Sequence, residues 1–211
     1  MARVVIIGGH GKVALLAHPL LKAAGHEVDA VIRNPQQAGD VEAAGAHPIV
    51  KDIETLDAAG FDDLVRGYDV VVWSAGAGGG NPQRTYAVDR DAAIASMDAA
   101  GRVGVPLYVM VSYFGASLNH GISPDHGFYA YAEAKAAADQ HLRESNLTWT
   151  ILAPSTLTLD EPSGRIDTAS TKPTHVSRGN VARAIVHAVS GAGTGRMVHF
   201  NDGDTPVDQA F

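Results

Sequence analysis

The chain has 211 residues, of which 45% are hydrophobic, so it can bury the core of one large domain. Its formal charge of 16 − 23 = −7 argues against general binding of nucleic acid. No uninterrupted apolar run approaches the ~18 residues of a membrane span, so we expect none. The absence of cysteine excludes disulfides, thiol nucleophiles and thiolate metal sites, and a cytoplasmic location fits this composition.

Short apolar runs alternate with helical patterns along the chain. The expected strands are apolar on both faces, which is typical of buried parallel strands: Val4–Ile7, Val28–Arg33, His47–Val50, Val70–Ser74, Leu107–Ser112 and Thr148–Ala153. The expected helices are Lys12–Ala24, Pro35–Ala44, Pro82–Val103, Tyr129–Ser145 and Arg178–Ser190, and a short strand, Met197–Phe200, follows the last of them. This alternation predicts a doubly wound parallel α/β sheet, a Rossmann fold, as a single domain over residues 1–211.

One segment breaks the alternation. Residues 155–175 are rich in Pro, Ser, Thr and Gly, and they predict an irregular substrate loop or lid within the single domain. Ser177, directly after this segment, is a plausible N-cap for the last long helix.

The first turn has the pattern of a phosphate cradle. Gly8, Gly11 and Ala14 form G-x-x-G-x-x-A between a strand and a helix. Small residues let backbone N–H groups approach a pyrophosphate, and the helix N-terminus adds partial positive charge. The alternative is a tight turn without a ligand. The predicted cofactor-binding residues here are Gly8, Gly9, His10, Gly11, Lys12 and Val13.

The second strand ends at a basic residue, at the position where NAD-binding folds have an acidic residue. This residue is Arg33, and its guanidinium can bind a 2′-phosphate through paired hydrogen bonds. Lys12 adds positive charge at the turn. NADP is therefore favoured over NAD, and a methyltransferase is disfavoured. The alternative is that Arg33 is only a solvated strand end.

Two further loops follow strands at the sheet edge where ligands bind. One contains Asp52 and Ile53, and the other runs from Ser74 through Ala75 and Gly76 to Gly80. Their small residues leave room for the adenosine. The run Gly78–Gly80 is equally well explained as a flexible loop.

A Tyr–Lys pair lies on one predicted helix. Tyr131 and Lys135 are four residues apart and share a helix face, and Ser112 ends the fifth strand. An ammonium near the phenol would lower its pKa, so that the phenol could exchange a proton with a carbonyl or alcohol. The serine hydroxyl could polarise the same oxygen. The alternative is an aromatic ring and a charge that share a face by chance.

These motifs, in this order and together with Pro154, resemble the short-chain dehydrogenases/reductases. The likeness covers essentially the whole chain and is greatest to their atypical branch of NmrA-like and biliverdin/flavin-reductase-like proteins. It implies hydride transfer with Ser112, Tyr131 and Lys135 as catalytic residues, and cofactor contacts from Lys135 and Pro154. One departure is the stretch SAGAGGG, which replaces the Asn-Ala-Gly of better-known members.

The prediction is thus an NADP-dependent oxidoreductase for a small carbonyl, alcohol or flat conjugated acceptor. Two alternatives stay open: an epimerase or dehydratase that retains its cofactor, and a non-catalytic module that senses the NADP redox state. The histidine spacing gives no metal site. Four rings, Tyr113, Phe114, Phe128 and Tyr129, could stack on a flat substrate, and we expect half of them to be ordinary core. The expected partner is a small molecule, with no nucleic acid or membrane, and a homo-oligomer is left open.

Overall fold

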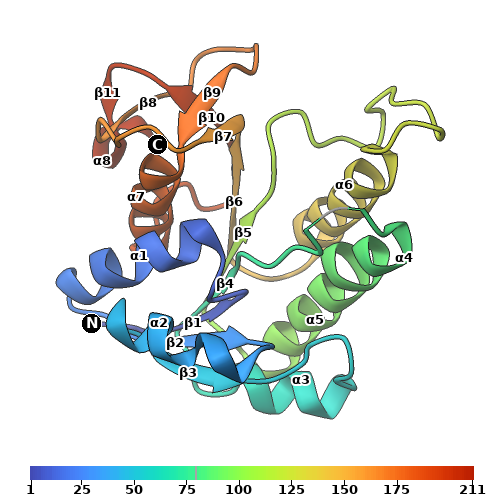
Figure 1. The fold of residues 1–211 in the computed structure, drawn as a ribbon, viewed down its shortest axis with the longest axis vertical. Helices are drawn as coiled ribbons and strands as arrows, with labels where there is room; N and C mark the ends of the chain where they lie inside the picture. The colour runs from blue at the N-terminus through green and yellow to red at the C-terminus, as the bar shows by residue number, and fades with distance from the viewer. Residues whose placement is uncertain (79) are drawn as a thin grey trace.

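The computed structural model describes residues 1–78 and 80–211, and Gly79, in the predicted glycine loop, lies outside them. A nine-stranded sheet in the order β11-β8-β10-β6-β5-β4-β1-β2-β3 forms the centre of the molecule (Figure 1). The strand order reverses between β1 and β4, which both pair in parallel with their neighbours. Ligands of open α/β sheets bind at such a reversal, beyond the carboxyl ends of the strands.

The strands of the parallel part are mostly buried, because helices cover both faces, and the edge strand β3 is the exception. The main strands are β1 Arg3–Ile7, β2 Glu27–Ile32, β3 His47–Val50, β4 Val70–Trp73, β5 Leu107–Val111, β6 Trp149–Pro154 and β10 Met197–Asp202. Two short strands, β8 Arg165–Asp167 and β11 Thr205–Pro206, extend the β10 edge in antiparallel pairing.

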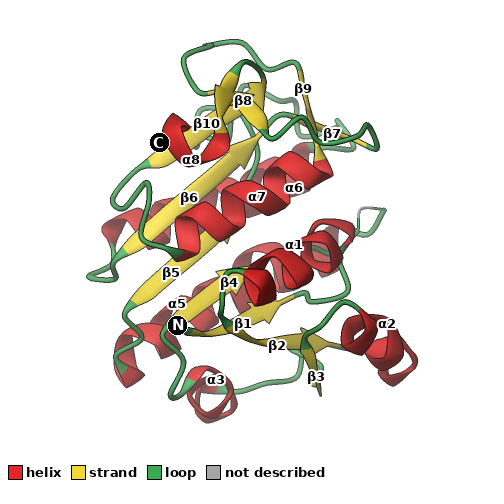
Figure 2. Cartoon of the chain, turned by 90° about the vertical axis from the view of Figure 1, so that its left-hand side faces the viewer, coloured by secondary structure: helices red, strands yellow, loops and turns green. Residues whose placement is uncertain are grey.

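Two apolar clusters, one on each side of the sheet, make up the core. Helices α1 Lys12–Ala23, α2 Ala38–Ala43 and α7 Arg178–Val189 pack on one face, and α3 Ala58–Val65, α5 Ala93–Val103 and α6 Tyr129–Glu144 on the other (Figures 1 and 2). Further short helical segments are the 3₁₀ turn η1 Pro35–Gln37, α4 Pro82–Thr85 and α8 Val207–Ala210, and a π-helical segment joins α4 to α5. No helix in the described part of the chain is long and apolar enough to cross a membrane.

The doubly wound parallel sheet is confirmed, and most predicted elements agree with the structure to within one or two residues. The exception is the helix predicted over Pro82–Val103. It consists of α4, a π-helical segment η2 Tyr86–Ala92, and α5. Widened turns of this kind occur often at functional sites. This one contains the buried Asp89, whose carboxylate accepts a hydrogen bond from the N–H of Ala77 at 2.9 Å.

Residues 155–175 are more regular than the sequence predicted. They contain β7 Thr156–Thr158 and β8, and β9 His175–Ser177 pairs with β7 as a separate two-stranded parallel sheet. The hydrogen bonds of these short strands lie between segments far apart in sequence, which local periodicity cannot show. The N-cap prediction is confirmed: the Ser177 hydroxyl oxygen accepts from the N–H of Asn180 at 3.2 Å.

Candidate cofactor and active site

The glycines of the first turn are needed for close packing as well as for a ligand. Gly8 has φ +89°, and a Cβ there would lie 2.5 Å from the backbone of Ala75. A Cβ on Gly9 would lie 2.5 Å from the Cβ of Ala30. The N–H groups of both glycines donate to the carbonyl oxygen of Val31. The turn therefore clamps the ends of three neighbouring strands together, which fixes the start of α1 at the reversal point.

The N-terminus of α1 is the part of this turn that fits an anion. Gly11 is the N-cap residue, and it offers no side-chain acceptor to the first-turn N–H groups. The carbonyl oxygen of Gly9 is hydrogen-bonded to Nε2 of the buried His18 at 2.7 Å. Lys12 and Val13 open this helix and line a cavity. These features fit a pyrophosphate at the helix N-terminus.

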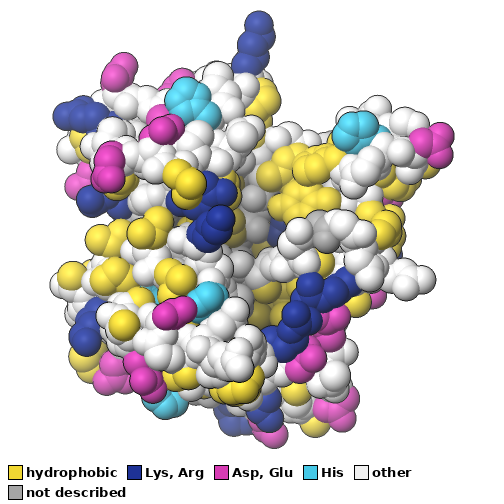
Figure 3. All heavy atoms as spheres, in the orientation of Figure 1, with side chains coloured by type: hydrophobic (Ala, Val, Ile, Leu, Met, Phe, Trp, Pro, Cys, Tyr) yellow, Lys and Arg dark blue, Asp and Glu magenta, His cyan; other side chains and the backbone are white. Residues whose placement is uncertain are grey.

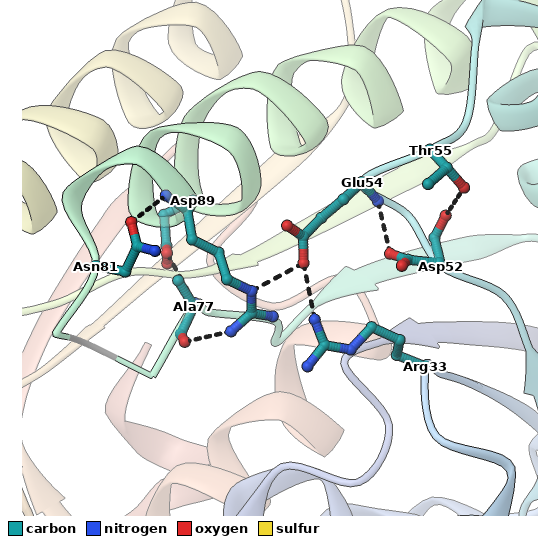
Figure 4. A network of polar contacts seen from close by, with 8 residues as sticks. Arg33, Asp52, Glu54, Thr55, Ala77, Asn81 and Asp89 are labelled. Carbon is teal, nitrogen blue, oxygen red and sulfur yellow. Dashed lines mark hydrogen bonds and ion pairs between the residues drawn. The ribbon is translucent and has the colours of Figure 1, made fainter.

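A cavity of about 350 Å³ lies beside this turn, over β2, β3 and β4. Arg33 lies at its edge with Nη1 3.1 Å from Oε1 of Glu54. The same carboxylate oxygen accepts from Nε of Arg84 at 2.9 Å, and Arg84 also donates to the carbonyl of Ala77 at 2.7 Å. Figure 4 shows Glu54 between the two guanidinium groups. Two cations from opposite sides of the cavity thus meet at one carboxylate.

A second cavity, of about 710 Å³, adjoins the first. Four residues line both: Gly11, Ser74, Ala75 and Gly76. The first is lined in addition by the predicted residues Gly8, His10, Arg33, Asp52 and Ile53, and the second by Lys12, Val13, Ser112, Tyr131 and Pro154. Two predicted residues, Gly9 and Lys135, are absent from the described walls of both cavities. The structure therefore brings most of the predicted cofactor residues together with Ser112 and Tyr131 around two adjoining cavities.

Tyr131 lies in a group of three aromatic rings on one wall of the larger cavity. Its ring centroid is 5.5 Å from that of Tyr113 and 5.1 Å from that of Phe128. Burial raises the pKa of Tyr131, and the carboxylates of Asp89 and Asp139 raise it further. The expectation of a lowered phenol pKa is therefore corrected, because the nearby buried charges are mostly negative and the phenol is shielded from water.

Ser112 and Lys135 are turned away from the cavity centre. The Ser112 hydroxyl donates to Oδ2 of Asp139, one helical turn beyond Lys135. Nζ of Lys135 donates to the carbonyl of Val111 at 2.8 Å and lies 3.2 Å from the sulfur of Met110. Burial lowers the pKa of Lys135, and burial raises that of Asp139. The predicted trio is near in space, but Ser112 and Lys135 make their polar contacts beneath the cavity wall.

Asp89, Arg84, Glu54 and Arg178 line these cavities and were not singled out from the sequence. Asp89 is 1% exposed, and burial raises the pKa of its carboxyl. A charged residue in the middle of an apolar helical pattern is the signal that could have found it. The positions of the other three depend on which loops face one another. Of the four aromatic residues in question, Tyr113, Phe114 and Phe128 line the larger cavity, whereas Tyr129 packs against His120.

Two other predicted residues, His10 and Asp52, make polar contacts with the protein itself. His10 lies 2.8 Å from Asp40 at the surface, and Asp52 caps its own turn by accepting from the N–H of Glu54 at 3.1 Å. Within residues 1–78 and 80–211, no three His, Asp or Glu side chains gather as a metal site.

A family model described as NAD(P)H-binding matches residues 8–191. The chain belongs to this family. A UPF0659 protein of Schizosaccharomyces pombe is 34% identical over 229 residues, covering 98% of this chain and 92% of that protein. The Bacillus subtilis protein YhfK, named as an uncharacterized sugar epimerase, is 28% identical over 217 residues, covering 99% of this chain and 98% of its own length.

The fold has a close structural counterpart. A solved structure from Bacillus halodurans, proposed to be an NAD-dependent epimerase/dehydratase, superposes with a TM-score of 0.88 at 29% identity. The match covers 99% of this chain and 97% of that one. The protein is therefore a nicotinamide-cofactor-binding Rossmann protein of the oxidoreductase and epimerase type, and the resemblance to atypical short-chain dehydrogenases/reductases is confirmed.

Proposed function

We propose that the protein is an NADP-dependent oxidoreductase that reduces a small carbonyl compound or a flat conjugated acceptor. The observation that carries this proposal is the lining of the larger cavity, which includes both Tyr131 and the first residues of α1. The smaller cavity adjoins it and shares wall residues with it.

The residues present fit the cofactor. Gly11, Lys12 and Val13 would bind the pyrophosphate at the helix N-terminus. Arg33 and Arg84 would bind the 2′-phosphate, which would displace the Glu54 carboxylate from the two guanidinium groups. The nicotinamide, when bound, would supply a hydride to the substrate. We propose that Pro154 and the small residues Ala75 and Gly76 shape the wall against which its ribose packs.

The proton comes from Tyr131 in this proposal. A phenol with a raised pKa stays protonated near neutral pH, and that is the form which donates a proton to a carbonyl oxygen becoming an alcohol. The Ser112 hydroxyl donates its hydrogen to Asp139, so its oxygen can accept from the hydroxyl of the alcohol product and has no hydrogen left for the substrate carbonyl. Lys135 balances the two buried carboxylates, Asp89 and Asp139, under the site. Water then reprotonates Tyr131 through the open cavity.

Cofactor affinity provides the direct test. We expect calorimetry to show NADPH binding at least about tenfold more tightly than NADH, equivalent to about 1.4 kcal/mol. Arg33→Gln should abolish this preference, whereas Arg66→Gln, an exposed arginine outside both cavities, should keep it. Equal affinities in the unmodified protein would refute the NADP assignment. Turnover is tested separately, by following NADPH oxidation with a panel of aromatic aldehydes and quinones.

An epimerase is the second candidate, because YhfK carries that name and the Bacillus halodurans protein is proposed to be one. An epimerase regenerates its cofactor in each cycle, whereas a reductase consumes one NADPH for each product. Stoichiometric loss of NADPH absorbance with a carbonyl substrate would support the reductase. Isomerisation of a sugar substrate without net loss of NADPH would support the epimerase.

A further inference from the structure

The larger cavity is lined by a cation, Arg178, that the proposed chemistry does not use. Arg178, the first residue of α7, lines it together with Lys12. Figure 3 shows Lys and Arg side chains at one side of a hollow and hydrophobic side chains at the other. The one acidic residue among the described lining residues is Asp89, which is 1% exposed. The accessible charge of this cavity is therefore positive.

The Arg178 guanidinium is held in place by backbone. Its Nη1 donates to the carbonyl of Thr158 at 2.7 Å and lies 3.3 Å from that of Leu157. Both carbonyls belong to β7, which pairs with β9 directly before α7. Among the described residues, no carboxylate forms an ion pair with Arg178. A guanidinium has five N–H donors in a planar fork, so an edge remains for an anion.

The position of Arg178 also runs against a local rule. A cation in the first turn of a helix opposes the helix dipole and costs typically about 0.3–1 kcal/mol. The first turn of α7 contains no acidic residue that would offset this cost. Departures from local preference are expected at functional sites, where a ligand supplies the compensating interaction. An anion beside Arg178 would be such a ligand.

The opposite wall is aromatic. The rings of Tyr113 and Phe128 meet edge to face with centroids 5.3 Å apart, and Phe128 is 38% exposed. Phe114 lines the same cavity. A large aromatic side chain left this accessible on a cavity wall offers a surface for a flat apolar ring system.

Charge and size limit the ligand further. The protein as a whole is acidic, with a formal charge of −7, so a substrate anion depends on local cations. Because Lys12 is assigned to the pyrophosphate, Arg178 is the cation left for the substrate among the described lining residues. The cavity of about 710 Å³ must also hold the reactive end of the cofactor. Sites for drug-sized molecules span roughly 300–1,000 Å³. The space remaining suits a small ring compound rather than a nucleotide sugar.

We propose that the substrate is a small planar compound bearing a carboxylate or a similar anionic group, and that Arg178 selects it. The anionic group pairs with the free edge of Arg178, and the ring lies against Tyr113 and Phe128. This inference rests on the proposed function, because it takes the larger cavity as the substrate site. Arg178 is a specificity-determining residue in this assignment, and Tyr131 remains the proton donor.

The test measures binding without turnover, so that its outcome is independent of catalysis. Naphthalene-2-carboxylate and naphthalene-2-carboxamide differ in charge and hardly in shape, and neither is expected to accept hydride. Each is titrated calorimetrically into the protein with NADPH, whose reduced ring is uncharged, and without cofactor. We expect the carboxylate to bind at least about tenfold more tightly than the amide in both series.

Variants then assign the effect. Arg178→Gln should remove the preference for the carboxylate while amide affinity stays within about twofold. Arg178→Lys should keep part of the preference, and Arg196→Gln, an exposed arginine outside the cavity, should keep all of it. An unfolding midpoint close to that of the unmodified protein confirms that each variant is folded. Equal affinities in the unmodified protein, no binding of either compound, or a preference that survives in folded Arg178→Gln would each overturn the assignment.

Discussion

Lys135 donates a hydrogen bond from Nζ to the backbone carbonyl of Val111 at 2.8 Å, although it lies one helical turn from Tyr131. The side chain is 1% exposed and lies between α6 and the end of β5. The charges nearest to it belong to Asp139 and Asp89, both of which favour its protonated form. The lysine of this Tyr–Lys pair therefore stabilises buried carboxylates and does not point at the phenol.

Replacing Lys135 with Met tests this electrostatic role. The variant retains an unbranched chain of similar size but removes the cation that most favours the ionised forms of Asp89 and Asp139, leaving them to the smaller effects of Arg84 and Arg143. Breaking a buried ion pair typically costs about 3–5 kcal/mol. Lys135 makes its direct contacts with the Val111 carbonyl and the Met110 sulfur and acts on the carboxylates from farther away, so we expect a smaller loss in the free energy of unfolding, measured by urea denaturation.

Adding Asp139→Asn to Lys135→Met should recover part of the lost stability, since it removes one unpaired charge. At temperatures where Lys135→Met is folded, we expect its NADPH affinity to stay within about threefold. A cofactor affinity reduced more than tenfold would instead show that Lys135 leaves Val111 to contact the ribose.

Tyr131→Phe should affect turnover and little else. The ring and its contacts with Tyr113 and Phe128 remain, while the donor is lost. We expect kcat for carbonyl reduction to fall about a hundredfold or more, and NADPH affinity to change by less than about threefold. Tyr129→Phe, on the same helix but outside the cavity, is the matched control and should retain full activity. Unchanged kcat in Tyr131→Phe would make the proton donor solvent, or a different residue.

Glu54→Gln should strengthen NADPH binding. In the structure the Glu54 carboxylate accepts from both Arg33 and Arg84, so a 2′-phosphate arriving there must compete with it and is repelled by its charge. Removing that charge should raise NADPH affinity about three- to tenfold and leave NADH affinity unchanged, as measured by calorimetry at low salt. A loss of NADPH affinity would mean that Glu54 is needed to hold the two arginines in position.

Much of this molecule follows from local pattern. Buried parallel strands and the glycine turn are local features, and hydrophobic periodicity and steric demand determine both. The direction in which Lys135 points is not local, because it depends on the carbonyl of Val111 and on two carboxylates distant in sequence. Arg178 and Phe128 become opposing walls only when α7 and the segment before α6 meet across the sheet edge. The kinds of side chain at the site could thus be predicted from the sequence, whereas the residues that each side chain contacts could not.

Asp139 should make stability fall as the pH rises above about 4. Burial raises its pKa in the folded state above that of an exposed aspartate, so the folded protein binds more protons than the unfolded chain in this window. The free energy of unfolding then decreases with pH, by at most about 1.4 kcal/mol per pH unit for one group. Asp89 acts in the same direction, and Lys135 opposes both by favouring their ionised forms.

Urea denaturation between pH 4 and 7 measures this contribution. We expect Asp139→Asn to gain stability relative to the unmodified protein as the pH rises, since asparagine cannot ionise and can still accept from Ser112. Asp125→Asn, at an exposed position, is the matched control. Parallel curves for Asp139→Asn and the unmodified protein would show that Asp139 does not titrate in this window.

The segment 155–175 should behave as a lid over the larger cavity. Ser155, Thr156, Leu157 and Pro173 line that cavity, and the short strands of the segment hold few hydrogen bonds compared with the main sheet. Without ligands, we expect its amides to exchange hydrogen much faster than those of β5 or β6. NADPH together with naphthalene-2-carboxylate should slow this exchange at least about tenfold, while α3, which lines neither cavity, changes little. Equal protection of the segment with and without the two ligands would exclude closure.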